Sequence, residues 1–246
     1  MINGLRDRIS LSERLLMSAG MVSKGNVVAD VGCDHAHTCI WLIKNGVVDS
    51  AIAMDVRKGP LDKAKANIDL YGLSNKIELR LSDGLDALTK GEADSIIIAG
   101  MGGTLTEQIL KKGLEKAVAA RELILQPQSD IGLVRRFLRE HGFRITDEKM
   151  CIESGKFYNS MRAVPIDDNV GGQNLTYSLE TEMFDEYGEI LLNGKNEVLK
   201  EFLQVLLRKN ERNLKQLGDG GNERALDKKR ALMHEKELIE LALGRF

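Results

Sequence analysis

The chain of 246 residues has few cysteines and no long hydrophobic run. Its three cysteines are Cys33, Cys39 and Cys151. A small, odd number of cysteines argues against a disulfide framework and fits a reducing compartment. No segment approaches the roughly 18 apolar residues of a membrane span, and the first residues lack the apolar core of a signal peptide. We therefore expect a cytoplasmic protein with no membrane partner.

The chain also has a small net charge and no recognised metal-binding motif. The formal net charge of -2 at pH 7 provides no overall attraction to nucleic acids, so a polyanionic partner would need a local basic surface. Metal-capable side chains gather between 33 and 39, but they show no structural-zinc spacing, and no second cluster completes a tetrahedron. We therefore expect no metal.

Strand-like and helix-like segments alternate through the first two thirds of the chain. Apolar runs predict buried strands at 27–31, 50–54, 76–81, 93–99 and 123–125. The segments between them predict helices at 11–21, 38–44, 60–70, 104–112 and 131–141. Two antiparallel strands, 143–150 and 157–164, close the series. This order predicts an α/β domain over 1–165 with a doubly wound, mostly parallel sheet.

The most informative segment is 27–35, Val-Val-Ala-Asp-Val-Gly-Cys-Asp-His, where an apolar strand leads into a tight turn before a helix. Ligands of open parallel sheets bind outside the carboxyl ends of the strands, at such a turn. A dinucleotide needs Gly-x-Gly-x-x-Gly, but Asp34 stands where the second glycine belongs and would repel a diphosphate. S-adenosylmethionine has no phosphate, so we predict this cofactor and a Rossmann-like methyltransferase fold. The alternative is an ordinary sheet turn.

Further polar or glycine-rich segments follow the other strands. Asp55 follows the glycine turn by about the number of residues at which a carboxylate can reach the ribose hydroxyls of a bound nucleoside. Ser82 or Asp83, after the next strand, can reach an adenine amine. Glycines at 100–103 permit close backbone approach where cofactor and substrate meet, although a ligand-free turn would explain them too. The predicted cofactor-binding residues are Asp30, Gly32, Cys33, Asp34, His35, Asp55, Val56, Ser82, Asp83, Gly84, Ala99, Gly100, Met101 and Gly102.

The composition changes at 165–174, a polar segment that we interpret as a linker. Apolar residues then recur at helical and heptad spacing, which predicts a coiled-coil-like helical hairpin, preceded by a shorter helix, over 175–246. Asn210 interrupts the apolar series. A single asparagine in such a series can fix the register of two helices at some cost in stability, but we expect this one to be partly exposed. Nine basic against five acidic residues between 205 and 236 make the hairpin tip basic, as a solvated helix face or a nucleic-acid contact would be.

Four blocks of sequence resemble, in order, those of the bacterial TrmK-type tRNA adenine-N1 methyltransferases. They are Ala-Asp-Val-Gly-Cys-Asp-His-Ala-His at 29–37, Ile-Ala-Gly-Met-Gly-Gly at 98–103, Leu-Ile-Leu-Gln-Pro-Gln at 123–128 and Glu-Ser-Gly-Lys-Phe-Tyr at 153–158. The resemblance covers 9–164 and, more loosely, the helical tail. It implies methyl transfer from S-adenosylmethionine to N1 of the adenine at tRNA position 22. The chain departs from the family pattern at Cys33, His37 and Asn159.

The chemistry of the motifs agrees with a ring nitrogen as the acceptor. Methylases of exocyclic amines commonly carry Asp or Asn, then Pro-Pro and an aromatic, at the position of 99–102, and this chain lacks them. Adenine N1 has a free lone pair, so its attack on the sulfonium methyl needs positioning more than proton removal. A carboxylate near the ring would stabilise the cationic product, which makes Asp34 the catalytic candidate. Equally, Asp34 could hold the methionine amino group.

A tRNA substrate requires contacts beyond the pocket. Extruding a base from folded tRNA costs a few kcal/mol and calls for phosphate contacts elsewhere. Segment 156–158 could stack near the target, although the alternation in an edge strand favours core packing. We expect a monomer. The predicted RNA-binding residues are Arg6, Arg8, Arg14, Arg135, Arg208, Arg212, Lys228 and Lys229.

Two other functions stay open from the residues alone. One is a methyltransferase that acts on a small molecule or a protein, and the other is a non-catalytic RNA-binding protein with a relic pocket. The basic hairpin tip favours RNA over a small substrate. The acidic series Asp30, Asp55 and Asp83 speaks against a relic pocket.

Overall fold

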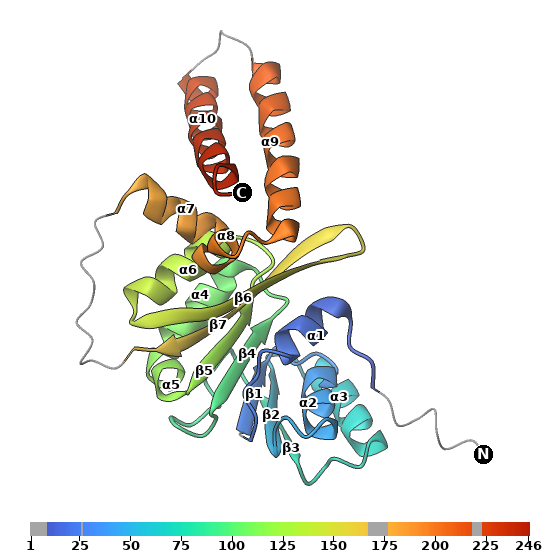
Figure 1. Ribbon diagram of the computed structural model, residues 1–246. Coiled ribbons are helices and arrows are strands. Elements are labelled where there is room, and N and C mark those ends of the chain that lie inside the picture. Colours follow the sequence, from blue (N-terminus) through green and yellow to red (C-terminus); the bar gives the residue numbers. More distant parts are fainter. Residues whose placement is uncertain (1–8, 26, 167–176, 218–222) are drawn as a thin grey trace. The chain divides into compact units, whose positions relative to one another are not determined.

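The computed structural model describes residues 9–25, 27–166, 177–217 and 223–246 (Figure 1). The chain divides into two compact units, Met1–Gly172 and Gln173–Phe246. The first contains the sheet with its flanking helices, and the second is helical.

The described residues of the first unit form a seven-stranded sheet with strand order β3-β2-β1-β4-β5-β7-β6. The first five strands pair in parallel, β7 is antiparallel to β5, and β6 is antiparallel to β7. The predicted α/β fold is therefore confirmed. The strands are β1 (Val27–Val31), β2 (Ser50–Asp55), β3 (Ile77–Leu81), β4 (Ser95–Ala99), β5 (Glu122–Gln126), β6 (Phe143–Glu153) and β7 (Lys156–Pro165).

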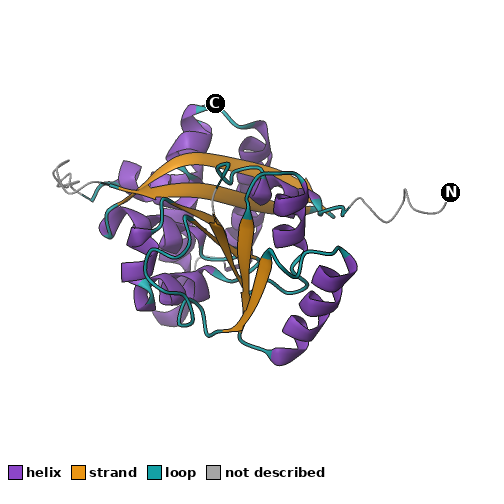
Figure 2. Ribbon diagram, turned by 90° about the horizontal axis from the view of Figure 1, so that it is seen from below, coloured by secondary structure: helices purple, strands orange, loops and turns teal. Residues whose placement is uncertain are grey.

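Helices cover both faces of this sheet, as Figure 2 shows. One apolar cluster packs the sheet against α1, α2 and α3, and the other packs it against α4, α5 and α6. Alternate residues of β4 enter opposite clusters, which explains its uninterrupted apolar sequence. The helices are α1 (Glu13–Ala19), α2 (His37–Lys44), α3 (Lys58–Leu70), α4 (Gly103–Lys112), α5 (Leu114–Ala119) and α6 (Ile131–Glu140). Of these, α5 was not expected from the sequence.

The second unit is built around an antiparallel pair of long helices. They are α9 (Glu197–Leu217) and α10 (Glu223–Leu243), preceded by α7 (Leu179–Tyr187) and α8 (Glu189–Asn193). The expectation of a partly exposed Asn210 is wrong, because this side chain is only 2% exposed. Its amide donates to the Leu232 carbonyl oxygen at 3.0 Å and to Glu235 Oε2 at 2.8 Å, both on α10. A buried amide with these partners fixes the register of the two helices.

Candidate cofactor site at the carboxyl edge of the sheet

The turn after β1 has the geometry that its glycine suggests. Gly32 has a φ of +73°, and Asp34 and Ala36 also lie in the left-handed region, so the chain reverses sharply before α2. The backbone N–H groups of Gly32 and Cys33 both donate to the Met54 carbonyl oxygen, at 2.8 and 2.9 Å. The turn is thereby fixed to the end of β2. The side chains of Asp34 and His35 approach each other at 3.5 Å at its surface.

Two carboxyl groups are buried beside this turn. Asp30 on β1 is 4% exposed and Asp55 at the end of β2 is 6% exposed. Burial raises the pKa of Asp30 to about 7, the Cys39 thiol that donates to it at 3.5 Å opposes the shift, and the charge of Asp55 adds to it. Burial and the same two carboxylates raise the pKa of Cys33. Three carboxyl groups, at Asp30, Asp34 and Asp55, gather at this turn, and such a site suits a cationic ligand better than a diphosphate.

Asp55 is fixed by its own turn. Its Oδ1 accepts the backbone N–H of Arg57 at 2.8 Å, which holds the carboxylate at the end of the strand. Val56, which follows it, is 60% exposed. An exposed apolar residue next to an anchored carboxylate suits one side of a nucleoside, because the base is apolar on its faces and the ribose is polar.

The loop after β3 is held by its own side chains. Ser82 is buried, and its hydroxyl donates to the Gly84 carbonyl oxygen at 2.9 Å and accepts the Ala87 N–H at 3.0 Å. Ser82 therefore shapes the loop, with its hydroxyl bonded inside it. The Asp83 side chain is 70% exposed at the same edge.

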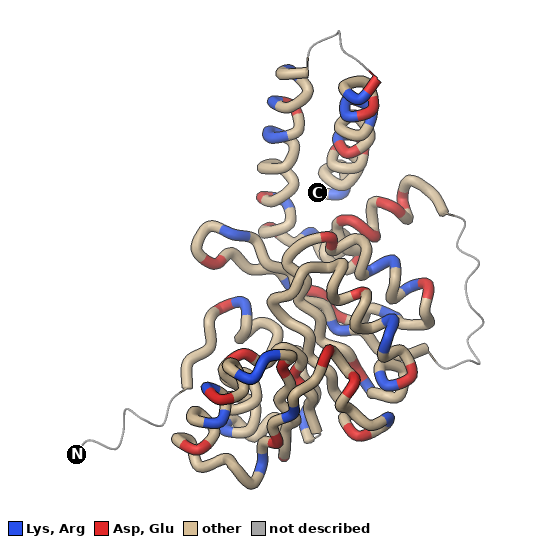
Figure 3. The backbone as a smooth tube through the Cα atoms, turned by 180° about the vertical axis from the view of Figure 1, so that it is seen from behind, with Lys and Arg blue, Asp and Glu red and all other residues tan. Residues whose placement is uncertain are grey.

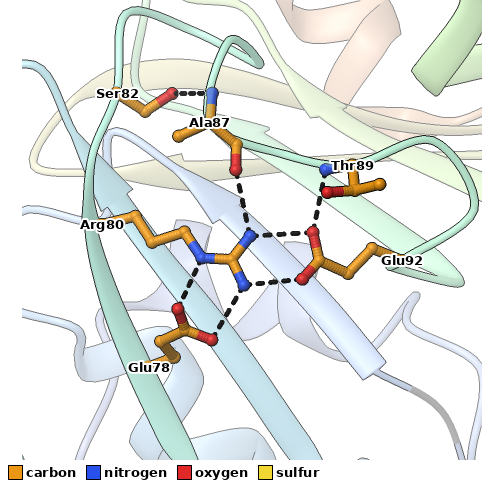
Figure 4. Close-up of polar contacts among 6 residues, drawn as sticks. All are labelled: Glu78, Arg80, Ser82, Ala87, Thr89 and Glu92. Carbon is orange, nitrogen blue, oxygen red and sulfur yellow. Dashed lines mark hydrogen bonds and ion pairs between the residues drawn. The ribbon is translucent and has the colours of Figure 1, made fainter.

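Arg80 clamps this loop to the edge of the sheet (Figure 4). Its guanidinium donates to the carboxylates of Glu78 and Glu92 and to the Ala87 carbonyl oxygen, at 2.6 to 3.0 Å. These bonds to Arg80 lower the pKa of Glu92 to about 2. The backbone of Ala87 is thus held at both its N–H, which donates to Ser82, and its carbonyl oxygen, which accepts from Arg80. Fixing a loop in advance reduces the entropy that a ligand must overcome.

The glycine-rich loop after β4 meets the turn after β1. Gly100 has a φ of +82°. A β-carbon at position 32 would stand 2.3 Å from Cε of Met101, so the Met101 side chain occupies the space that the missing Gly32 side chain leaves. The Gly100 N–H donates to the Gln126 carbonyl oxygen at 3.1 Å, which joins the loop to β5.

All the predicted cofactor residues therefore lie at one edge, at or just after the carboxyl ends of β1 to β4. These strands are adjacent in the order β3-β2-β1-β4. The glycine turn at 32, the buried carboxylates and the pre-formed loop 82–92 fit the nucleoside and cationic parts of S-adenosylmethionine. An acidic edge of this kind does not fit the pyrophosphate of a dinucleotide.

The predicted RNA-binding residues differ in their surroundings. Arg6 and Arg8 lie outside the described residues. Arg14, on α1, lies at the carboxyl edge near Gly100. The prediction for Arg135 is wrong, because this side chain is buried and its Nε donates to Glu148 on β6 at 2.8 Å. Its charge balances a buried carboxylate, which prevents contact with a phosphate.

The predicted basic residues of the hairpin lie at its surface. Arg208 and Arg212 on α9 and Lys228 on α10 are exposed, and Lys229 is partly exposed. Figure 3 shows Lys and Arg along both helices, with acidic residues between them. A contact with the phosphate backbone of an RNA is compatible with this exposure.

The prediction from sequence missed Gln126, which ends β5 at the same edge. Its carboxamide is fully buried and bonds with Arg14, Ser18 and Ser160. A polar residue at the end of a buried strand, just before Pro127, was the signal that could have found it.

Metal and membrane features are missing from the described part of the chain. Within it, no three His, Cys, Asp or Glu side chains gather so that they could hold a metal ion. None of the helices described is both long and apolar enough to cross a membrane.

Comparisons with known proteins agree with this site. A family model described as a methyltransferase domain matches residues 11–161. The tRNA (adenine(22)-N(1))-methyltransferase of Bacillus subtilis is 36% identical over 201 residues, which are 81% of this chain and 83% of that protein.

Solved structures give the same result over nearly the whole chain. The B. subtilis m1A22 tRNA methyltransferase TrmK matches with a TM-score of 0.84 and 31% identity, over 96% of this chain and 100% of that one. Streptococcus pneumoniae Sp1610, in complex with S-adenosyl-L-methionine, matches with a TM-score of 0.78 and 32% identity, over 95% and 100%. The chain therefore belongs to the TrmK family of tRNA (adenine(22)-N(1))-methyltransferases.

Proposed function

We propose that this protein transfers the methyl group of S-adenosylmethionine to N1 of the adenine at position 22 of tRNA. The observation that carries the proposal is the acidic, glycine-lined edge over β1 to β4, in a chain whose TrmK relatives are named for this reaction. The B. subtilis relative is named for adenine 22, and Sp1610 was solved with S-adenosyl-L-methionine.

Different residues at the edge bind different parts of the cofactor. Asp55 accepts hydrogen bonds from the ribose hydroxyls, with Val56 against the nucleoside. Asp83 and Gly84, in the loop that Arg80 clamps, meet the adenine amine. The turn from Gly32 to His35 holds the methionine portion, and Asp34 faces its amino group.

The cofactor supplies an electrophilic methyl group, so the protein needs to align the acceptor and stabilise charge. The lone pair of adenine N1 forms the new bond to carbon while the bond from carbon to sulfur breaks, and positive charge moves from sulfur to the purine. No base is required, because N1 carries no proton at neutral pH. Asp34 is our candidate for stabilising the new cation, as an alternative to its role at the amino group, since a carboxylate near the ring favours a positive charge there.

The two parts of the chain have different roles in this proposal. Segment 1–165 binds the cofactor and carries out methyl transfer, and segment 175–246 binds tRNA through Arg208, Arg212, Lys228 and Lys229. The partner is tRNA and the enzyme acts as a monomer. We place the enzyme in the cytoplasm, in keeping with its tRNA substrate.

Incubation with S-adenosylmethionine labelled in the methyl group and with unmodified tRNA tests the proposal. We expect label in tRNA and none in a matched tRNA that carries guanine at position 22. Cofactor binding without labelling of any tRNA would favour a small-molecule or protein substrate. Absence of cofactor binding would leave a non-catalytic RNA-binding protein.

A further inference from the structure

We propose that Arg14, Gln128 and Tyr158 form the subsite that receives the target nucleotide beside Gly100. In this subsite Tyr158 stacks on the extruded base and Arg14 binds a phosphate of the same strand. The inference rests on the proposed function and adds to it the position of the substrate.

The topology separates this subsite from the cofactor. The cofactor residues at 32–35, 55–56 and 82–84 follow β1, β2 and β3, on one side of the Gly100 loop, and those at 99–102 belong to that loop itself. Arg14, Gln128 and Tyr158 come from α1, from the residues after β5 and from β7, on the other side. A β-carbon on Gly100 would lie 3.6 Å from Nη1 of Arg14 and 3.7 Å from Nε2 of Gln128. Two nitrogen donors therefore converge at the loop that borders the cofactor.

Arg14 is held in position from three sides. Its Nη1 donates to Oε1 of the buried Gln126 at 3.0 Å, and its backbone N–H donates to Glu153 at 2.8 Å. Its carbonyl oxygen accepts Nε2 of Gln126 at 2.7 Å. A guanidinium has five N–H donors. Among the described residues, only Gln126 accepts a hydrogen bond from the guanidinium of Arg14. The remaining donors are oriented in advance for an anion such as phosphate.

Tyr158 provides an aromatic surface next to this cation. It lies on β7 opposite Cys151 of β6, and its ring is partly buried. Ser160, two residues further on the same face, bonds with Ser18 of α1 at 2.8 Å, so this face of β7 is the one that meets α1. Cζ of Arg14 is 5.6 Å from the ring centroid. An aromatic ring beside a guanidinium is a common arrangement for holding an unstacked base and its backbone.

The reaction itself gives stacking on Tyr158 a catalytic advantage. The target purine is neutral when it enters and acquires a positive charge as the methyl group is transferred. A cation is attracted by the face of an aromatic ring more strongly than a neutral base is. Stacking on Tyr158 is therefore stronger in the transition state than in the ground state, which raises the turnover rate as well as the affinity.

The experiment measures the binding of wild-type and variant full-length protein to two tRNAs, one with adenine and one with an abasic nucleotide at position 22. We expect Tyr158→Ala to weaken binding to the adenine form by about tenfold or more and to leave the abasic form unchanged. Tyr158→Phe keeps the ring and should behave as wild type. Arg14→Gln should weaken binding to both tRNAs and reduce the slope of log K against log salt by about one.

Turnover provides a second readout. At saturating tRNA, kcat of Tyr158→Ala should fall while Tyr158→Phe retains it. Tyr71→Ala and Arg121→Gln are matched controls, because they remove a tyrosine and an exposed arginine that lie elsewhere in the first unit. Calorimetry with S-adenosylmethionine shows that each variant has kept its fold and its cofactor site.

Each outcome decides the proposal. Equal losses of Tyr158→Ala on the two tRNAs, or no loss on either, would overturn stacking by Tyr158, and an unchanged salt slope in Arg14→Gln would overturn the phosphate contact. If the wild-type protein labels no tRNA, the proposed function itself fails. If it labels position 22 while the variants behave as wild type, only the subsite fails.

Discussion

The Met101 side chain fills the space in front of Gly32, where a β-carbon would stand 2.3 Å from the Met101 methyl group. The loop after β4 and the turn after β1 are therefore in direct contact, although 69 positions separate the two residues in the chain. This contact ties the cofactor turn to the loop that borders the substrate.

We expect Gly32→Ala to lose stability and affinity for S-adenosylmethionine, because the alanine must adopt a φ of +73° and its methyl group must displace the end of the Met101 side chain. The left-handed conformation alone costs about 1 kcal/mol. Gly72→Ala is the matched control, since Gly72 has a φ of +67° with nothing within 4 Å. Urea unfolding should show a larger loss for Gly32→Ala than for the control. Equal losses would mean that the contact with Met101 has no energetic role.

The buried Asp30 predicts a dependence of stability on pH. Its pKa rises from 3.8 to about 7 on folding, chiefly through burial, so the folded state holds a proton that the unfolded state releases. The contribution of Asp30 to the free energy of unfolding is fully present below pH 3.8 and is lost as the pH rises through about 7. The total loss is roughly 4 kcal/mol at most. Between pH 3.8 and about 7, the free energy of unfolding of the wild-type protein should therefore fall relative to that of Asp30→Asn. Parallel pH profiles of the two proteins would contradict the assignment.

Removal of the Asp55 carboxylate should weaken cofactor binding. Asp55→Ala deprives the ribose hydroxyls of a charged acceptor, and such hydrogen bonds contribute about 1.5–3 kcal/mol, or about tenfold to a hundredfold in affinity. Asp62→Ala, on the exposed side of α3, is the control. Titration calorimetry with S-adenosylmethionine measures both, and an unchanged affinity in Asp55→Ala would count against its role.

The clamp made by Arg80 should act on the cofactor and not on tRNA. We expect Arg80→Met to free the loop 82–92 and to raise KM for S-adenosylmethionine about fivefold or more, with KM for tRNA unchanged. Arg80→Lys keeps the charge and should recover part of the effect. Arg144→Met removes an exposed arginine of β6 as a control. A parallel rise of both KM values would indicate a general loss of structure instead.

Neutralising the hairpin charges should weaken tRNA binding without affecting the cofactor. We expect replacement of Arg208, Arg212, Lys228 and Lys229 by Gln to reduce the salt dependence of tRNA binding, by about 0.7 to 0.9 in slope for each phosphate that the protein no longer neutralises. The control replaces four basic residues that are exposed in the first unit, namely Lys24, Lys63, Lys90 and Arg121. If both sets lower the affinity equally, the hairpin has no special role in RNA binding.

The sequence alone indicated the order of strands and helices, because apolar periodicity and turn residues act over a few neighbouring positions. It also indicated which residues follow each strand. In a parallel sheet the carboxyl ends share one edge, so local signals at Gly32, Asp55, Asp83 and Gly100 were sufficient to outline the candidate cofactor site. The resemblance at 29–37 and 98–103 rests on the same local signals.

The environment of each charged or amide side chain was decided only by the tertiary structure. Arg14 and Arg135 look alike in the sequence, yet one lies at the carboxyl edge and the other is buried against Glu148. Asn210 is buried by a helix that follows it in the chain. Such differences depend on partners that are distant in sequence, because a buried charge or amide is stable only where the fold supplies its counterpart.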